Sequence, residues 1–543
     1  MLLNLDFLAR STDVGQKRKQ KRGNKSELLG GIYLKIMENI SSAAEAESLH
    51  QHWDFVNLIL IVLGAMSFYA LGRKRARRQH VSVKAHERKN LGCSFLQGRR
   101  VDLSPAENAM ISNSVRFPGQ MRILSNVELV GPAITKGFVQ SKLAILQKRH
   151  PVLQCTVEKH SGGHANSYQL VQDGSAKVNI KEIWTTHDGT DKPWQEIWKV
   201  EGRNALKVGE MVLRVVIIRY TNEPKRTNLL IMVEHGFSDG LCVSQFVHEL
   251  LLLMSGDSKL IDAYSFDPLP WNAPLEEMCT TGNRNWLFQI LSWMAQSTCS
   301  VVSDVIPHKV SPKVVPKDVV KGPELLQTYK DFTPEESARL LQACRENGTS
   351  VTAAVAIAML DAMADVSNTL ENTISPRNFV TQIAADLRRH YSQPIDKEHL
   401  FYHAACTAPM KLYTMGNLSS SEMWEEARVG RKHVIESSKR GDAKGAAQLL
   451  GSILGFEEYI PPCTATLTSW GKLPIQATYG PWTLGAHRPC VNTCNSKLVM
   501  VICTTVQNKT NLAFVANSNV SNDKVLELVK MRTYEKLLTM MKK

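Results

Sequence analysis

The sequence lacks the cysteine patterns and nucleophile motifs that mark several large classes of protein. Its 11 cysteines form no C-x-x-C pair and have no histidine partner at zinc-finger spacing, which argues against a structural zinc site. The odd count and the dispersed apolar settings are typical of reduced thiols in a cytosolic compartment. No G-x-S-x-G elbow is present, so the covalent serine chemistry of the α/β-hydrolases is not predicted.

Internal repeats and long low-complexity tracts are also absent. With 43% apolar and 21% charged residues the chain has a globular composition, and 543 residues predict two or three folded units. The net charge is +14, but residues 1–91 contain 16 Lys and Arg against 8 Asp and Glu, so the rest of the chain is only mildly basic. A mild excess suits an anionic ligand without specifying one.

Only one long apolar run stands out, at residues 55–71. Its 17 residues contain no charge and one polar amide, Asn57, and as a helix they would span about 26 Å, enough for a thin bilayer. The basic run at 73–78 follows directly, which favours a single-pass membrane anchor over a buried core helix or a cleaved signal peptide. The positive-inside rule then places the rest of the chain in the cytosol, and the span suits the endoplasmic reticulum.

Two polar segments flank this predicted anchor. Residues 1–54 contain a basic cluster at 17–22 and a weakly acidic Ser/Ala/Glu-rich stretch, which predicts a disordered tail. Residues 72–94 are predicted to be a basic juxtamembrane linker. A nuclear-localisation or nucleic-acid patch is the alternative for the run at 73–78, but its position against the apolar span favours a membrane stop.

Residues 229–254 combine a strand, a turn and a helix around one histidine. The apolar run 229–233 is typical of a buried strand, and apolar residues from Val243 to Met254 recur on one face of an amphipathic helix. Between them His235, Asp239 and Gly240 have the spacing H-x-x-x-D-G, expected by chance about 0.03 times at this composition. Rigid elements on both sides hold the histidine as a positioned base requires. The alternative is a loop histidine beside a helix-capping aspartate.

At these residues the sequence resembles the condensation-domain-like acyltransferase superfamily, which includes alcohol acetyltransferases, the plant BAHD acyltransferases and peptide-synthetase condensation domains. The resemblance implies that His235 is the catalytic base, that Asp239 is a structural aspartate pointing away from the substrate, and that Gly240 keeps the turn tight. Peptide-synthetase domains usually have a second histidine just before the catalytic one, where this chain has Glu234. This departure favours an enzyme that uses free acyl-CoA over a carrier-dependent condensation domain.

The globular body is predicted to begin near residue 95 and to contain two lobes. Capping boxes at Ser104 and Thr333, each followed by proline, predict helix starts, and residues 211–220 and 228–234 predict an antiparallel strand pair. Four prolines among lysines and valines predict a linker at 303–325, between an N-terminal lobe at 95–302 and a C-terminal lobe at 326–543. The resemblance implies an α/β (α+β), two-lobe chloramphenicol-acetyltransferase-like fold, with a mixed sheet backed by helices in each lobe and a tunnel between them.

The resemblance also suggests further site residues and substrates. Asp239 is expected to pair with an arginine of the second lobe, for which Arg388 is the candidate, and Ser469 and Trp470 are candidates for lining the tunnel or stabilising an oxyanion. The expected substrates are acyl-CoA and an alcohol or amine acceptor, lipophilic if the enzyme is anchored beside a bilayer. We expect a monomer with no metal, no bound cofactor and no nucleic-acid partner. The alternatives are a carrier-protein-dependent condensation-type domain and a catalytically silent, membrane-anchored scaffold of the same fold.

Overall fold

The computed structural model describes residues 95–160, 167–280, 324–391, 400, 403–454, 463–493 and 498–542. The predicted tail, anchor and juxtamembrane linker at 1–94 lie outside these residues, as does nearly all of the predicted linker at 303–325. Within the described part of the chain, one helix, α12 (Val351–Glu371), has the length and apolar composition to cross a membrane. Most of α12 is buried in the protein, which is the pattern of a core helix.

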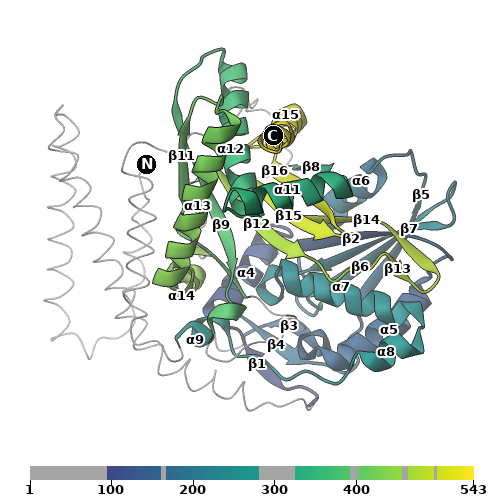
Figure 1. Cartoon of the computed structure of the whole chain (residues 1–543). Helices are drawn as coiled ribbons and strands as arrows, with labels where there is room; N and C mark the ends of the chain where they lie inside the picture. Colours follow the sequence, from purple (N-terminus) through teal and green to yellow (C-terminus); the bar gives the residue numbers. More distant parts are fainter. Residues whose placement is uncertain are drawn as a thin grey trace, which may run out of the picture. The chain divides into compact units, whose positions relative to one another are not determined.

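The first sheet has six strands and carries the predicted strand–turn–helix segment. Its spatial order is β13 (Thr478–Tyr479), β14 (Trp482–Val491), β2 (Ile123–Val130), β7 (Arg226–Val233), β6 (Leu213–Tyr220) and β5 (Asn179–Thr185). All neighbours are antiparallel except β5 and β6, and the β6–β7 pair confirms the hairpin predicted from the sequence. Helices α5 (Lys136–Arg149) and α7 (Gly240–Ser255) pack against each other, and α7 also packs on β2 (Figure 1).

The second sheet has seven strands and is backed by its own helices. The order is β10 (Ala404–Cys406), β9 (Arg377–Asp386), β12 (Ala465–Lys472), β15 (Val499–Val506), β16 (Lys509–Asn517) and β8 (Leu325–Asp331), with β11 (Met410–Thr414) also paired to β9. One face of this sheet shares a core with α11 (Pro334–Glu346), α12, α13 (Ser420–Arg440) and α15 (Asp523–Met540). Side chains of the opposite face, such as Val380, Met500 and Ile502, join the core of the first sheet. The two sheets therefore form two lobes whose inner surfaces meet.

Strand β14 crosses from the second half of the chain into the first sheet, where it pairs with β2 over residues 483–491. The predicted boundary at residue 326 therefore does not separate the two sheets, because β13 and β14 lie within the predicted C-terminal lobe of 326–543. Pro489 would be unsuited to a central strand, since it has no N–H to donate. At that position β14 has a strand partner on one side only, because β13 pairs only with residues 482 and 483.

Local sequence signals set several of the helix starts. Ser104 and Thr333 both form complete capping boxes, which confirms the predicted starts of α4 (Pro105–Arg116) and α11. After α5 the chain forms a short 3-10 helix, η2 (Pro151–Gln154), before β3 (Cys155–Lys159) begins. Proline at the first position fixes φ and suits a helical turn better than a strand. β3 joins β4 (Tyr168–Gln172) and β1 (Arg100–Asp102) in a small third sheet.

The remaining helices are short or lie at the junctions between the sheets. They are α6 (Lys192–Glu201), η3 (His235–Phe237), α8 (Ser258–Ala263), α9 (Leu275–Thr280), η4 (Arg388–His390) and α14 (Asp442–Leu454). Among these, α14 packs against α4, α9 and β10, and α4 packs against η3. Elements of both halves of the chain therefore surround the turn that carries the H-x-x-x-D-G motif.

Candidate functional site

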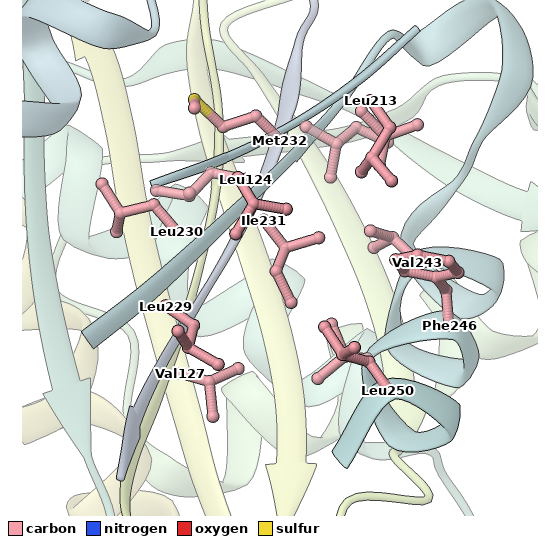
Figure 2. Close-up of a cluster of buried hydrophobic side chains, with 14 of the residues drawn as sticks. Leu124, Val127, Leu213, Leu229, Leu230, Ile231, Met232, Val243, Phe246 and Leu250 are labelled. Atoms are coloured by element: carbon pink, nitrogen blue, oxygen red, sulfur yellow. The ribbon is translucent and has the colours of Figure 1, made fainter. Parts of the chain in front are cut away.

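The turn between β7 and α7 is anchored on both sides by a fully packed core. Leu229, Ile231 and Met232 of β7 and Val243 and Phe246 of α7 are at most 1% exposed. They belong to one cluster with side chains of the neighbouring strands (Figure 2). β7 ends at Val233, the 3-10 turn η3 follows, and α7 begins at Gly240. Because buried side chains lock both elements, the backbone of the intervening turn has little freedom to move.

His235 occupies the first position of η3 and is half-buried. Its Nδ1 lies 2.8 Å from the carbonyl oxygen of Ser238. A carbonyl oxygen only accepts hydrogen bonds, so Nδ1 carries the proton in this contact and Nε2 carries the lone pair. Burial lowers the pKa of His235 from its ordinary value, although the Ser238 carbonyl, Asp239 and Glu234 act in the opposite direction. The imidazole is therefore neutral near pH 7 and in the tautomer of a proton acceptor at Nε2.

Asp239 caps α7 and at the same time joins the two lobes. Its Oδ1 accepts hydrogen bonds from the backbone N–H groups of Leu241 and Cys242, each at 3.1 Å. The Arg388 guanidinium donates from Nη2 to both carboxylate oxygens, at 3.1 and 2.9 Å, and the His403 backbone N–H donates to Oδ2 at 3.0 Å. The carboxylate is thus occupied by the helix end and by the second lobe rather than by the His235 ring.

The charges of this interlobe pair fit its buried position. Burial alone would raise the pKa of Asp239, but Arg388, His403 and the Cys242 N–H outweigh it and hold the pKa below its usual value. Burial would likewise lower the pKa of Arg388, while Asp239 and Asp386 keep it raised. Asp386 accepts a second hydrogen bond from Arg388 Nη1 at 3.0 Å. Both members of the pair are therefore charged, and the structure places Arg388 where the sequence analysis proposed it.

Glu234, which stands where condensation domains usually have a second histidine, is committed to a separate buried ion pair. Its Oε1 accepts hydrogen bonds from Arg122 Nη2 at 2.6 Å and Nε at 2.8 Å, and its Oε2 accepts one from Ser114 at 2.6 Å. Both charged side chains are at most 3% exposed. Arg122 also donates to the carbonyl oxygens of residues 201, 202 and 204. The carboxylate of Glu234 therefore fixes the end of β7 and is unsuited to act as a second base.

Gly240 is required by the close approach of Trp470. A Cβ atom on Gly240 would lie 2.0 to 2.2 Å from atoms of the indole ring, which no ordinary packing allows. Trp470 is the extra residue of a bulge in β12, because Ser469 pairs with Cys503 and Gly471 pairs with Thr504. Gly471 has a φ of +68°, a backbone conformation that favours glycine. The bulge thus directs the indole onto the start of α7.

Ser469 and Trp470, the two candidates from this segment, have different surroundings. Ser469 is paired in register with Cys503, whose side chain belongs to the core on the helix-covered face of the second sheet. Trp470 belongs to the core shared by the two lobes. The structure therefore brings Trp470 to the H-x-x-x-D-G turn, where its indole lies on Gly240, while Ser469 is in register with a residue of the other core.

Three features of the site had no sequence signal strong enough to identify them. His403 reaches Asp239 through its backbone, and Arg122 reaches Glu234 from 112 residues away. The Cys242 thiol lies beside Asp239, but burial and that carboxylate raise its pKa to about 12, so it stays protonated and is a poor nucleophile. Within the described ranges, no group of three His, Cys, Asp or Glu residues could hold a metal ion.

Solved structures with the same arrangement of lobes support this description, although no protein-family model matches the sequence and no curated protein matches it significantly. The TRI3 trichothecene 15-O-acetyltransferase from Fusarium sporotrichioides matches with a TM-score of 0.62 and 12% identity, over 81% of this chain and 95% of its own. The condensation domain of the monacolin K polyketide synthase MokA matches with a TM-score of 0.61 and 14% identity, over 82% of this chain and 98% of its own.

A third similar structure is a complex with C8-CoA. This mutant of the starter condensation domain of the rhizomide synthetase RzmA matches with a TM-score of 0.56 and 11% identity, over 81% of this chain and 94% of its own. These matches span almost the whole length of each known structure and most of this chain. The chain therefore has the same two-lobed, mixed α/β fold as these condensation domains and this acetyltransferase.

Proposed function

We propose that the protein is a CoA-dependent acyltransferase that moves an acyl group from acyl-CoA to a hydroxyl or amine acceptor, with His235 as the general base. The observation that carries this proposal is the orientation of the His235 ring. The Ser238 carbonyl holds Nδ1–H, so Nε2 presents a lone pair from a turn that is clamped between the two lobes. A fixed, neutral imidazole is the group that can take a proton from an acceptor near pH 7.

The reaction needs no covalent enzyme intermediate. Nε2 of His235 removes the proton from the acceptor hydroxyl or amine as its oxygen or nitrogen attacks the thioester carbonyl. The tetrahedral species then collapses, the bond from the carbonyl carbon to sulfur breaks, and the CoA thiolate leaves with the proton that the imidazolium returns. Asp239 takes no part in these proton transfers, since its oxygens are held by Arg388, His403 and the amides of α7. Its role is to hold the two lobes and the turn in register.

We assign the oxyanion donor to the second lobe. The indole of Trp470 rests on Gly240, five residues after His235, and its Nε1 is among the atoms nearest to Gly240. An indole N–H is a donor without an acceptor function, which suits a developing negative charge. Trp470 is therefore our candidate for stabilising the tetrahedral species, and Ser469 is not, because it is in register with Cys503 of the helix-covered core.

Acyl-CoA is the proposed donor in preference to a carrier-bound acyl group. Glu234 replaces the second histidine of peptide-synthetase domains, and its ion pair with Arg122 leaves His235 as the base at this turn. The membrane anchor at 55–71 and a body in the cytosol remain predictions from the sequence. With that anchor in place, a lipophilic acceptor would reach the enzyme from the bilayer beside it.

The test is CoA release by the full-length protein. Purified protein is incubated with acetyl-CoA, octanoyl-CoA and palmitoyl-CoA and a set of alcohols and amines, and free thiol is measured with a colorimetric reagent. We expect His235→Ala to lower the rate about 10²- to 10⁴-fold, the contribution of a positioned base. The matched control is His160→Ala, since His160 follows β3 of the small third sheet and pairs there with Asp102 of β1.

Two outcomes would contradict this proposal. Release from acyl groups on a carrier protein, with none from free acyl-CoA, would support the condensation-type alternative. If no donor of either kind is consumed while the protein is folded, the catalytically silent scaffold is the better description.

A further inference from the structure

The face of the second sheet that packs against the first lobe carries a short line of uncharged polar side chains near the H-x-x-x-D-G turn. Thr466 of β12 is paired in register with Gln382 of β9 and with Met500 of β15, and Thr468 lies two residues further along β12. Val380, Met500 and Ile502 of the same face belong to the core shared with the first lobe. Gln382, Thr466 and Thr468, called the polar row below, therefore face the first lobe and not the helices behind the sheet.

The two threonines of the polar row are partly exposed, whereas Gln382 beside them is only 6% exposed. β12 is flanked by β9 and β15, and its alternate residues Ala465 and Leu467 are fully buried against the helices. Thr466 and Thr468 are nevertheless half-buried, so solvent reaches them from the side of the lobe interface. Neither hydroxyl, nor the Gln382 side-chain amide, makes a hydrogen bond that the structure records among the described residues. Hydrogen-bonding groups at such a position are usually satisfied by protein, by water or by a ligand.

The polar row also lies within the length of a small substrate from Trp470, which packs on the turn that carries His235. β9 and β12 run parallel and lie side by side (Figure 1). Beyond the row, β9 leads to Arg388, which binds Asp239, and β12 leads to Trp470, which packs on Gly240. At a rise of about 3.3 Å per residue, Thr468 lies roughly 7 Å and Thr466 roughly 13 Å from Trp470 along the strand. A substrate whose reacting atom lies at His235 can place a group of its own against the row.

Resting on the proposed acyltransferase function, we propose that the polar row binds the acceptor and selects one that carries a second, neutral hydrogen-bonding group, such as a further hydroxyl or an amide. The row contains no charge, and its register partners Met500 and Ile502 are apolar. An anionic or cationic group would gain no partner there and would lose its hydration. An acceptor with only a hydrocarbon chain would leave these three polar groups without partners, and its binding would therefore be strongly disfavoured.

Threonine is also favoured in strands for its branched Cβ alone, and a Thr→Val substitution separates the two roles because it keeps the branch and the shape while removing the hydroxyl. Thr504 of β15 provides the matched control. It lies on the same face of the same sheet but is 0% exposed, and its hydroxyl has no hydrogen-bond partner in the described part of the protein. T504V therefore makes the same chemical change where no substrate can reach.

The experiment compares two acceptors of equal chain length, octan-1-ol and octane-1,8-diol, with acetyl-CoA or octanoyl-CoA as donor and the full-length protein. We expect wild type and T504V to prefer the diol in kcat/KM, and T466V/T468V to lose that preference by about five- to tenfold, the effect of one or two neutral hydrogen bonds. An unchanged preference in the double variant, or no preference in wild type, overturns the proposal that the polar row binds the acceptor. Neither result contradicts the proposed acyltransferase function.

A second measurement, independent of turnover, is the shift in Tm that each alcohol causes. If no acceptor is acylated but the diol stabilises wild type and T504V more than the double variant, the polar row is supported and the acyltransferase function is overturned. If the two alcohols shift all three proteins equally and no acceptor is acylated, both proposals are overturned.

Discussion

The substitution Asp239→Asn tests whether the aspartate of the motif holds the lobes together or takes part in the reaction. The asparagine keeps the size of the side chain and an oxygen that can cap α7, but it removes the charge that faces Arg388. Both side chains of the pair are at most 6% exposed, so the remaining guanidinium loses a partner in a poorly hydrated site. Removing one member of a buried pair costs about 3–5 kcal/mol. Because Asp386 still binds Arg388 at 3.0 Å, we expect the lower end, about 3 kcal/mol.

The assay is urea denaturation followed by tryptophan fluorescence, with CoA release measured on the folded protein. The matched control is Asp386→Asn, which removes the other carboxylate bound to the same guanidinium. Its side chain is 26% exposed, so its loss should cost less than about 1 kcal/mol. The stability difference between wild type and Asp239→Asn should also depend on pH. The pKa of Asp239 is below its usual value, so its contribution is fully present above about pH 4 and disappears as the pH falls further.

One result would refute this reasoning. If Asp239→Asn unfolds at the same urea concentration as wild type but has lost CoA release, the carboxylate acts in the chemistry and the interlobe clamp is not its main role. A midpoint that falls by the expected amount, with activity retained at low temperature where the variant is folded, supports the structural role.

Three further predictions concern the same turn. Because burial lowers the pKa of His235 below its ordinary value of 6.5, kcat/KM should stay level from pH 8 down to about 6.5 and fall only below that, and a decline that starts above pH 7 would contradict the lowered pKa. Gly240→Ala would normally favour a helix, but here the contact with Trp470 should make it destabilising by about 1–3 kcal/mol. When Trp470 is already replaced by alanine, Gly240→Ala should leave the Tm of thermal unfolding unchanged or raise it. Glu234→Gln should lower stability by about 3 kcal/mol, since it leaves Arg122 buried without its carboxylate, and a rise in CoA release without loss of stability would contradict this.

Asp239 shows that the two interpretations of the motif were not exclusive. The sequence suggested either a catalytic-site aspartate or a simple helix cap, and the structure has the carboxylate capping α7 while it binds Arg388 of the other lobe. The cap follows from local sequence, because an Asp just before a helix can accept hydrogen bonds from the free backbone N–H groups of the first turn. The ion pair does not, because it joins residues 149 positions apart.

The direction of side chains within the second sheet could not be predicted from the sequence. Ser469 and Trp470 were equal candidates for the site, and the bulge in β12 decided between them by sending only the indole to Gly240. The polar row could not be identified either, because whether an alternate residue of a strand faces helices or the other lobe depends on the layers that cover it. The same applies to β14, whose pairing with β2 joins parts of the chain more than 350 residues apart.

The sequence by itself determined the elements whose signals are contiguous: the capped helix starts at Ser104 and Thr333, the β6–β7 hairpin, and the strand–turn–helix that positions His235. Local hydrogen bonds and hydrophobic periodicity are enough to specify such units. Only the tertiary structure decided which strand completes the first sheet, which residues clamp the turn and which polar groups face the lobe interface. Those choices depend on how surfaces distant in sequence fit together when they are buried, and no local pattern encodes that fit.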